Sequence, residues 1–132
     1  MLEVEIIGTP GVAGAPLAAE VERLLAFAFA TAGIDAGHVA LEYVDAQRIA
    51  ELNEEYRGKE GPTDVLSFPL DETGVLGEPP EARELGDIII CVAHTADLRE
   101  AIVHGGLHLV GMDHETDEGE MLAVQAEILS WG

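Results

Sequence analysis

The sequence is poor in basic residues and in cysteine, and each shortage excludes a class of protein. Lysine and arginine number 6 against 26 aspartates and glutamates, which gives a formal net charge of −20 at pH 7. A chain of this charge is repelled by a polyanion at long range, so the composition argues against unaided binding of RNA. The single cysteine, Cys91, permits no disulfide within the chain, as is usual in a reducing cytosol.

Two kinds of hydrophobic segment are also missing. No basic N-terminal region precedes an apolar run, and no uninterrupted apolar stretch reaches about 18 residues, so neither a signal peptide nor a membrane span is expected. What is present is 132 residues with 48% hydrophobic content, enough to bury about two thirds of the unfolded surface. We therefore expect one cytoplasmic domain covering residues 1–132.

The hydrophobic pattern predicts an α+β fold. Strands are expected at 2–7 and 39–44, at 65–68 on an edge closed by Pro69, and at 85–91 as a buried central strand. Helices are expected from Pro16 to Gly33, from the cap Asp45 to Gly58, from a cap at Thr95 through residue 110, and over a last segment with Asp117 and Glu120 in capping-box spacing. The prediction is a small mixed sheet of about four strands with helices packed on it, the last of which covers the sheet.

Residues 104–114, HGGLHLVGMDH, contain three of the five histidines. His104 and His108 are four residues apart, so on a helix both imidazoles can reach one cation. Gly111 ends the helix, and the reversed chain can bring back His114 as a third ligand. Three imidazoles suit Zn²⁺ and leave a fourth position open for water, which is the arrangement of a catalytic site. We expect about one zinc ion per chain.

The histidines also allow other interpretations. A lone histidine on an apolar helix face is usually a core residue, but three histidines with an intervening glycine fit a metal site better. The spacing matches the metalloprotease pattern H-E-x-x-H-x-x-G-x-x-H except that Gly105 replaces the glutamate base. His38 is interpreted as a solvated loop residue and His94 as a surface residue. Asp113 or Glu115 could orient an imidazole through its second nitrogen, or be solvated.

A second candidate segment, LNEEYRGKEGPTDVLSFP, spans residues 52–69. Arg57 presents a planar fork of donors that matches phosphate oxygens, although it could equally pair with a carboxylate such as Glu54. The edge strand that follows could offer unpaired backbone groups to an extended ligand. For Asp64 and Ser67, a turn cap and a strand hydroxyl are favoured over contact with substrate. Gly105 and Gly106 each cost about 1 kcal/mol inside a helix, which indicates close packing or room for substrate.

These two segments, together with LGDIII at 85–90, resemble the YbeY family of bacterial metal-dependent endoribonucleases of ribosomal RNA maturation. The resemblance covers the C-terminal two thirds of the chain. It implies zinc held by His104, His108 and His114, and a substrate-facing Arg57. The sequence departs from the family pattern in a shorter connection over residues 91–103 and in Met112, where a tyrosine is common.

The prediction from sequence is thus a zinc-dependent, single-strand-specific endoribonuclease acting in rRNA maturation and ribosome quality control, with Arg57, His104, His108 and His114 as catalytic residues. Its expected partners are single-stranded RNA, rRNA and the ribosome, with no membrane. The residues leave open whether water or the ribose 2′-hydroxyl attacks. Two alternatives remain: a zinc-dependent peptidase-like hydrolase, and a non-catalytic RNA-binding module associated with the ribosome.

Overall fold

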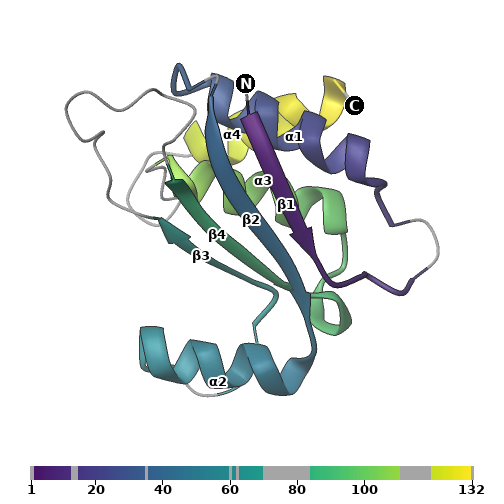
Figure 1. The fold of residues 1–132 in the computed structure, drawn as a ribbon, viewed down its shortest axis with the longest axis vertical. Helices are drawn as coiled ribbons and strands as arrows, with labels where there is room; N and C mark the ends of the chain where they lie inside the picture. Colours follow the sequence, from purple (N-terminus) through teal and green to yellow (C-terminus); the bar gives the residue numbers. More distant parts are fainter. Residues whose placement is uncertain are drawn as a thin grey trace.

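The computed structural model describes residues 2–12, 15–34, 36–59, 61, 63–69, 84–110 and 120–131. Its strands are β1 (Leu2–Ile7), β2 (Gly37–Val44), β3 (Val65–Pro69) and β4 (Glu84–Cys91). They form one sheet in the order β1-β2-β4-β3 (Figure 1). The pairs β1/β2 and β2/β4 are parallel, whereas β3 is antiparallel to β4. The predicted α+β fold with a mixed four-stranded sheet is confirmed, including the central place of β4 and the edge position of β3.

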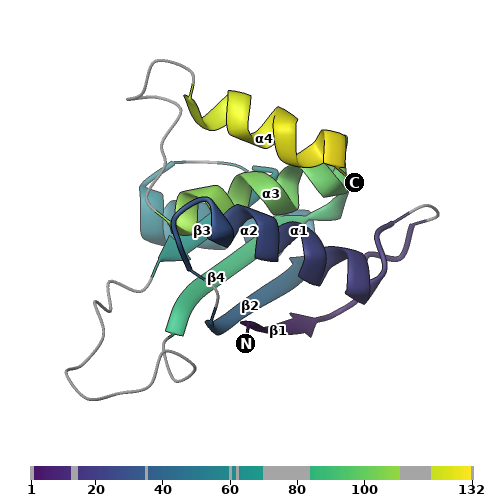
Figure 2. The same ribbon diagram turned by 90° about the horizontal axis from the view of Figure 1, so that it is seen from above.

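Helices lie on both faces of this sheet, and one face carries more of them than the other. They are α1 (Ala18–Ala30), α2 (Ala46–Arg57), α3 (Leu98–Leu109) and α4 (Glu120–Trp131), with a short 3-10 helix, η2 (Val92–His94), before α3. Figure 2 shows α1, α3 and α4 stacked on one side of the sheet, with α4 farthest from it. No helix in the described part of the chain is both long and apolar enough to cross a membrane.

The alternating side chains of β4 divide the hydrophobic core in two. Ile88 and Ile90 belong to a large cluster with residues of α1, α3 and α4, whereas Ile89 and Cys91 belong to a smaller cluster with residues of α2. Because successive strand side chains point to opposite faces, α2 lies on the face opposite α3. Cys91 is fully buried in this second cluster, so it is a core residue.

Three local predictions were wrong. Thr95 does not cap α3; its hydroxyl donates to the Cys91 carbonyl at 2.6 Å, and the cap is Asp97, whose carboxylate accepts from the backbone of Arg99 and Glu100. The last helix, α4, packs on α3 and α1 rather than on the sheet. His38 lies inside β2, not in the loop before it.

The two glycines inside α3 allow it to approach its neighbours closely. A Cβ at Gly105 would lie 2.7 Å from Ile88 Cγ2, and one at Gly106 would lie 3.0 Å from Leu25 Cδ2. Real Cβ atoms are essentially never found at the first distance, so a side chain at position 105 would push α3 off the sheet. Of the two reasons expected for these glycines, close packing is confirmed.

Candidate metal centre

The helix α3 brings His104 and His108 together, as their spacing predicted. Their Nε2 atoms are 3.1 Å apart, and their rings meet edge to face with centroids 4.7 Å apart at an interplanar angle of 74°. Both side chains are half-buried. Two nitrogens at this distance either share a proton or aim both lone pairs at one cation.

The separation of the two nitrogens fits a zinc ion. Zn–N bonds of about 2.0–2.1 Å at a tetrahedral angle place two ligand nitrogens about 3.3–3.4 Å apart. The observed 3.1 Å is close to this value, so both histidines could bind one ion without a change of rotamer. Imidazole nitrogens are also preferred ligands of Zn²⁺. The described part of the donor set therefore fits the metal that the sequence predicts.

A buried glutamine fixes the tautomer of the first histidine. Gln125 on α4 is 6% exposed, and its Oε1 lies 2.9 Å from Nδ1 of His104. A carboxamide oxygen only accepts hydrogen bonds, so Nδ1 of His104 carries the proton, and in the neutral imidazole the lone pair is on Nε2, which lies 3.1 Å from Nε2 of His108. This is the form in which imidazole binds a metal, and such hydrogen bonds commonly orient metal ligands.

Gln125 was missed from the sequence, although a signal was present. It occurs between Met121 and Ile128 at spacings of four and three, so it falls on the buried stripe of α4. A polar residue on an apolar stripe needs a hydrogen-bond partner once it is buried. The partner itself could not be named, because it lies on another helix 21 residues earlier in the chain.

The third predicted ligand, His114, lies outside the described residues, as do Gly111, Met112, Asp113 and Glu115. Within the part of the chain that the structure describes, no three histidine, cysteine, aspartate or glutamate side chains are grouped to hold a metal ion. The site is thus described for two of its three predicted ligands, and the part played by His114 stays a prediction.

Arg57 lies on a different element from the histidines. It is the last residue of α2, with an exposed side chain, and Gly58 ends the helix in the left-handed conformation at φ 65°. The turn beyond it is held by the amide of Asn53, which donates to the Gly61 carbonyl at 2.9 Å. Among the described residues no hydrogen bond or ion pair joins Arg57 to Glu54 or to either histidine. Its substrate role therefore stays a prediction.

The edge strand β3 connects the segment after Arg57 to the metal helix. The Asp64 carboxylate accepts from the backbone N–H of Val65 at 2.8 Å, which confirms the predicted turn cap. The hydroxyl of Ser67 donates to the carbonyl of Gly105 at 3.1 Å. Ser67 thus holds α3 against β3, one residue along the helix from His104.

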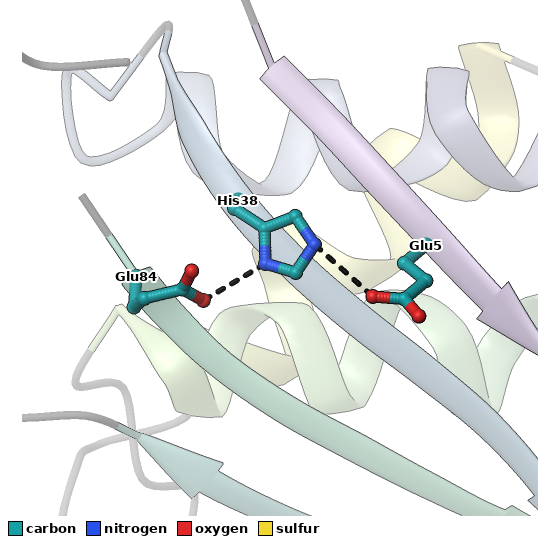
Figure 3. Close-up of polar contacts among 3 residues, drawn as sticks. All are labelled: Glu5, His38 and Glu84. Atoms are coloured by element: carbon teal, nitrogen blue, oxygen red, sulfur yellow. Dashed lines mark hydrogen bonds and ion pairs between the residues drawn. The ribbon is translucent and has the colours of Figure 1, made fainter. Parts of the chain in front are cut away.

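His38 is the centre of a second polar group, formed across three strands (Figure 3). Its Nδ1 lies 2.8 Å from a carboxylate oxygen of Glu84 on β4, and its Nε2 lies 3.3 Å from one of Glu5 on β1. The hydrogen bond to Glu84 raises the pKa of His38 above its ordinary value, outweighing the opposite effect of burial. Both ring nitrogens face carboxylates, so His38 is a hydrogen-bond donor in this structure. His94, the remaining histidine that the structure describes, is exposed in η2, as expected of a surface residue.

Comparison with known proteins gives one family. The family model described as Endoribonuclease YbeY matches residues 11–131. The protein of that name from Bacillus pumilus (strain SAFR-032) is 38% identical over 148 residues, covering 97% of this chain and 93% of its own length. That from Bacillus subtilis (strain 168) is 38% identical over 149 residues, with 97% and 94% covered.

A solved structure is similar as well. The solution structure of a protein from Thermotoga maritima matches with a TM-score of 0.54 and 27% sequence identity, covering 98% of this chain and 87% of that one. The alignment with the Bacillus pumilus protein runs over 148 residues but includes 97% of the 132 residues here, so that relative has additional residues inside the aligned region.

Proposed function

Because the chain belongs to the YbeY family of endoribonucleases, we propose that it is a zinc-dependent, single-strand-specific endoribonuclease acting in the cytoplasm in rRNA maturation and ribosome quality control. Its partners would be single-stranded RNA, rRNA and the ribosome. The observation that supports the proposal most directly is the pair of Nε2 atoms 3.1 Å apart on α3, one of them held in the metal-binding tautomer by Gln125.

In the proposed mechanism, His104, His108 and His114 hold the metal. When bound, zinc supplies a Lewis acid for a phosphoryl oxygen and lowers the pKa of a water molecule toward about 7. Gln125 keeps the Nδ1 proton of His104 in place, so that the Nε2 lone pair stays directed at the site. Arg57 presents a guanidinium to the phosphate and stabilises the negative charge that develops in the transition state.

The charge of the chain restricts how RNA can bind. Arg48 and Arg57 are nine residues apart on α2, which places them about 13–14 Å apart along the helix axis, and Arg48 has Glu51 at 3.5 Å. Arg48 and Arg57 are therefore too far apart to bind the same phosphate, and each can contact only a separate one. We expect RNA binding that involves few phosphates and depends weakly on salt, with about −0.7 in the log–log slope for each phosphate neutralised.

The peptidase alternative is disfavoured by the position of Gly105. In the metalloprotease pattern this position carries the general base, but here it faces the sheet, and a side chain would collide with Ile88. The absence of a glutamate at position 105 thus goes together with the close packing of α3 on the sheet. A peptidase built on this helix would need its base from another element.

The test is zinc content measured together with cleavage of a defined single-stranded RNA and of its duplex. We expect about one zinc per chain, cleavage of the single strand, and little cleavage of the duplex. Identification of the product ends then distinguishes attack by water from attack by the 2′-hydroxyl. Binding of RNA without turnover by fully metallated protein would support the non-catalytic alternative, and cleavage of an unfolded protein such as casein would support the peptidase.

A further inference from the structure

The outer edge of β3 is the edge of the sheet that lies beside the metal helix. β3 is the last strand in the order β1-β2-β4-β3, and Figure 1 shows it as the outermost strand on its side of the sheet. In the described part of the chain, no strand pairs with this edge. The hydroxyl of Ser67, in the middle of β3, donates to the carbonyl of Gly105, the residue that follows His104 on α3. A ligand bound along this edge would therefore lie next to the helix that carries the histidines.

The ladder between β3 and β4 fixes which backbone groups face outward. In an antiparallel pair, residues that exchange hydrogen bonds with the partner strand alternate with residues whose N–H and C=O point away from it. The N–H of Cys91 donates to the carbonyl of Asp64 at 2.8 Å, so Asp64 is a residue of the first kind. Along the register, every second residue of β3 then directs its backbone groups outward. These residues are Val65, Ser67 and Pro69.

Within the described strand β3, Ser67 is the only residue that offers both a free donor and an acceptor on this edge. The N–H of Val65 is already used, because it donates to the carboxylate of Asp64 at 2.8 Å. Pro69 has no N–H. Among the described residues, no backbone hydrogen bond outside the sheet involves the N–H or the carbonyl of Ser67. The edge thus presents one N–H beside one C=O.

This pattern does not suit another β-strand. An added strand needs a donor at every second residue of the edge, and proline on an edge strand is a usual means of preventing strand addition. Here two of the three outward positions, Val65 and Pro69, lack a free N–H. A phosphate does not suit the edge either, because the carbonyl oxygen beside the N–H repels an anion. The group that fits is a small neutral one with a donor and an acceptor side by side.

The Watson–Crick edge of a nucleobase is such a group. Uracil presents N3–H beside a carbonyl oxygen, guanine presents N1–H beside O6, and adenine and cytosine each present an amino group beside a ring nitrogen. Each base can therefore bind the N–H and C=O of one residue. In a duplex these atoms are occupied by the partner base, whereas the unpaired bases of single strands are recognised on this edge. A contact of this kind selects single strands without selecting a sequence.

The net charge of the chain increases the need for contacts to bases. Only 6 of the 132 residues are lysine or arginine, so few phosphates can be neutralised. Two of the six, Arg57 and Lys59, precede β3, and the turn after them is held by the hydrogen bond from Asn53 to the Gly61 carbonyl. Hydrogen bonds to a neutral base add affinity without requiring further cations.

We propose that the outer edge of β3 is a base-binding site, in which the backbone N–H and C=O of Ser67 bind the Watson–Crick edge of an unpaired base of the RNA at the metal centre. This inference rests on the proposed function, since it assigns the selection of single strands to a part of the same RNA-cleaving site. The selection then depends on the backbone of one strand rather than on a side chain.

The first test changes the RNA. Two fluorescently labelled pentanucleotides carry either N3-methyluridine or 5-methyluridine at every position, with phosphorothioate linkages that slow cleavage. Both bases have one added methyl group, but only N3-methyluridine has lost the N3–H. Binding to the full chain as purified should be about 5- to 150-fold weaker for the N3-methyluridine oligomer, the range of one good bidentate pair. Equal affinities for the two oligomers would overturn the proposal.

The second test changes the strand. Ser67→Pro removes the outward N–H, whereas Ser67→Ala, its matched control, keeps it; both remove the hydroxyl that bonds to Gly105. Because this N–H takes no part in the ladder with β4, proline removes no hydrogen bond of the sheet. Ser67→Pro should bring the affinity ratio of the two oligomers toward one, and Ser67→Ala should keep the wild-type ratio. A wild-type ratio in Ser67→Pro contradicts the assignment. Should this variant fail to fold, the comparison of the two oligomers on the wild type decides by itself.

Cleavage by zinc-loaded protein separates the two proposals. Faster cleavage of a 5-methyluridine strand than of an N3-methyluridine strand, both with ordinary phosphate linkages, supports both. Equal rates of cleavage retain the nuclease and remove the base-binding site. Absence of cleavage together with weaker binding of the N3-methyluridine oligomer removes the nuclease and retains the base-binding site.

Discussion

Two histidine sites lie in the part of the protein that the structure describes, and the residues that contact their ring nitrogens differ in charge. On α3, the Nδ1 proton of His104 is held by a neutral carboxamide, which places the lone pair of the neutral ring on Nε2, the atom that faces His108. On the sheet, His38 lies between two carboxylates, with Nδ1 2.8 Å from Glu84 and Nε2 3.3 Å from Glu5, and the hydrogen bond to Glu84 raises its pKa. An imidazole held by Gln125 keeps a lone pair available, whereas one held by Glu5 and Glu84 is stabilised in its protonated form.

The comparison shows that the protonation of a histidine ring depends more on the residue that contacts its nitrogens than on the number of acidic residues in the chain. The chain has 26 aspartates and glutamates, yet the residue that contacts Nδ1 of His104 is Gln125, one of the few buried polar residues in the described part of the chain. A neutral partner fixes the ring without adding charge to the site.

Replacing a histidine with alanine should strongly lower zinc binding and RNA cleavage when the histidine lies on α3, and should leave both unchanged when it lies on the sheet. His104→Ala should lower zinc content from about one per chain to a small fraction. It should also lower RNA cleavage by about 10³-fold or more, since a catalytic metal contributes several kcal/mol to transition-state stabilisation. His38→Ala, which is the matched control, should keep both zinc and cleavage. Elemental analysis and cleavage rates at matched melting temperature provide the measurement. Normal zinc content in His104→Ala would contradict the metal assignment.

Substitution of Arg57 tests whether residues on both faces of the sheet contribute to RNA cleavage, because Arg57 belongs to α2 and the histidines belong to α3. Arg57→Ala should keep fold and zinc but lower kcat by on the order of 10²–10³, the loss expected for one preorganised donor of the transition state. Arg57→Lys should recover little, since a point charge does not reproduce the guanidinium fork. Arg23→Ala on α1 removes the same charge as a control. Cleavage within a few-fold of wild type would make Arg57 a surface residue.

Gln125 should have an intermediate effect. Gln125→Ala removes the acceptor at Nδ1 of His104, and loss of such a partner typically lowers metal affinity by about 10- to 100-fold. Gln125→Glu keeps an acceptor at this atom and should retain most of the affinity. Competition with a zinc chelator measures both variants, and circular dichroism checks that α4 is intact. If Gln125→Ala binds zinc as tightly as wild type, the hydrogen bond does not orient the ligand.

His38 should give the smallest effect, and one that depends on pH. Its pKa is raised in the folded state by Glu84 and Glu5, so its contribution to stability is fully present below about pH 6.5, the ordinary value, and is lost as the pH rises through the folded-state pKa. Both partners are more than half exposed, so the contribution is about 0.2–1 kcal/mol. Urea unfolding of wild type and His38→Gln at pH 5.5 and pH 8 measures it. A difference between the two proteins that grows with pH would reverse the assigned sign.

Local features of the fold could be predicted from the sequence because their causes are local. The caps of α2, Asp45 and Gly58, are observed as predicted, and so is the pairing of His104 with His108, which requires only helical spacing. Thr95 was assigned wrongly because a hydroxyl can bond to several nearby carbonyls, and the tight 3-10 turn offers it that of Cys91.

The relations between distant elements could not be predicted. The register of β2 and β4 places Glu84 opposite His38, whereas the β1 residue opposite His38 is Glu3, and His38 reaches diagonally to Glu5, two residues farther along β1. Gln125 meets His104 because α4 crosses α3 at this point rather than lying on the sheet. Neither the crossing of two helices nor the register of two strands is encoded in a local sequence pattern. The sequence therefore indicates that a buried polar residue needs a partner, but not which residue that partner is.

The glycine pair of α3 also bears on when the metal site can form during synthesis of the chain. Two adjacent glycines make this stretch a weak helix by itself, and it is stabilised by contacts with Ile88 and Ser67 on one side and Leu25 and Ala28 on the other. These contacts come from three segments of the chain, all made before the histidines. Gln125 is made last, after both of them. A nascent chain therefore has His104 and His108 before it has Gln125, and high-affinity zinc uptake should follow the synthesis and docking of α4.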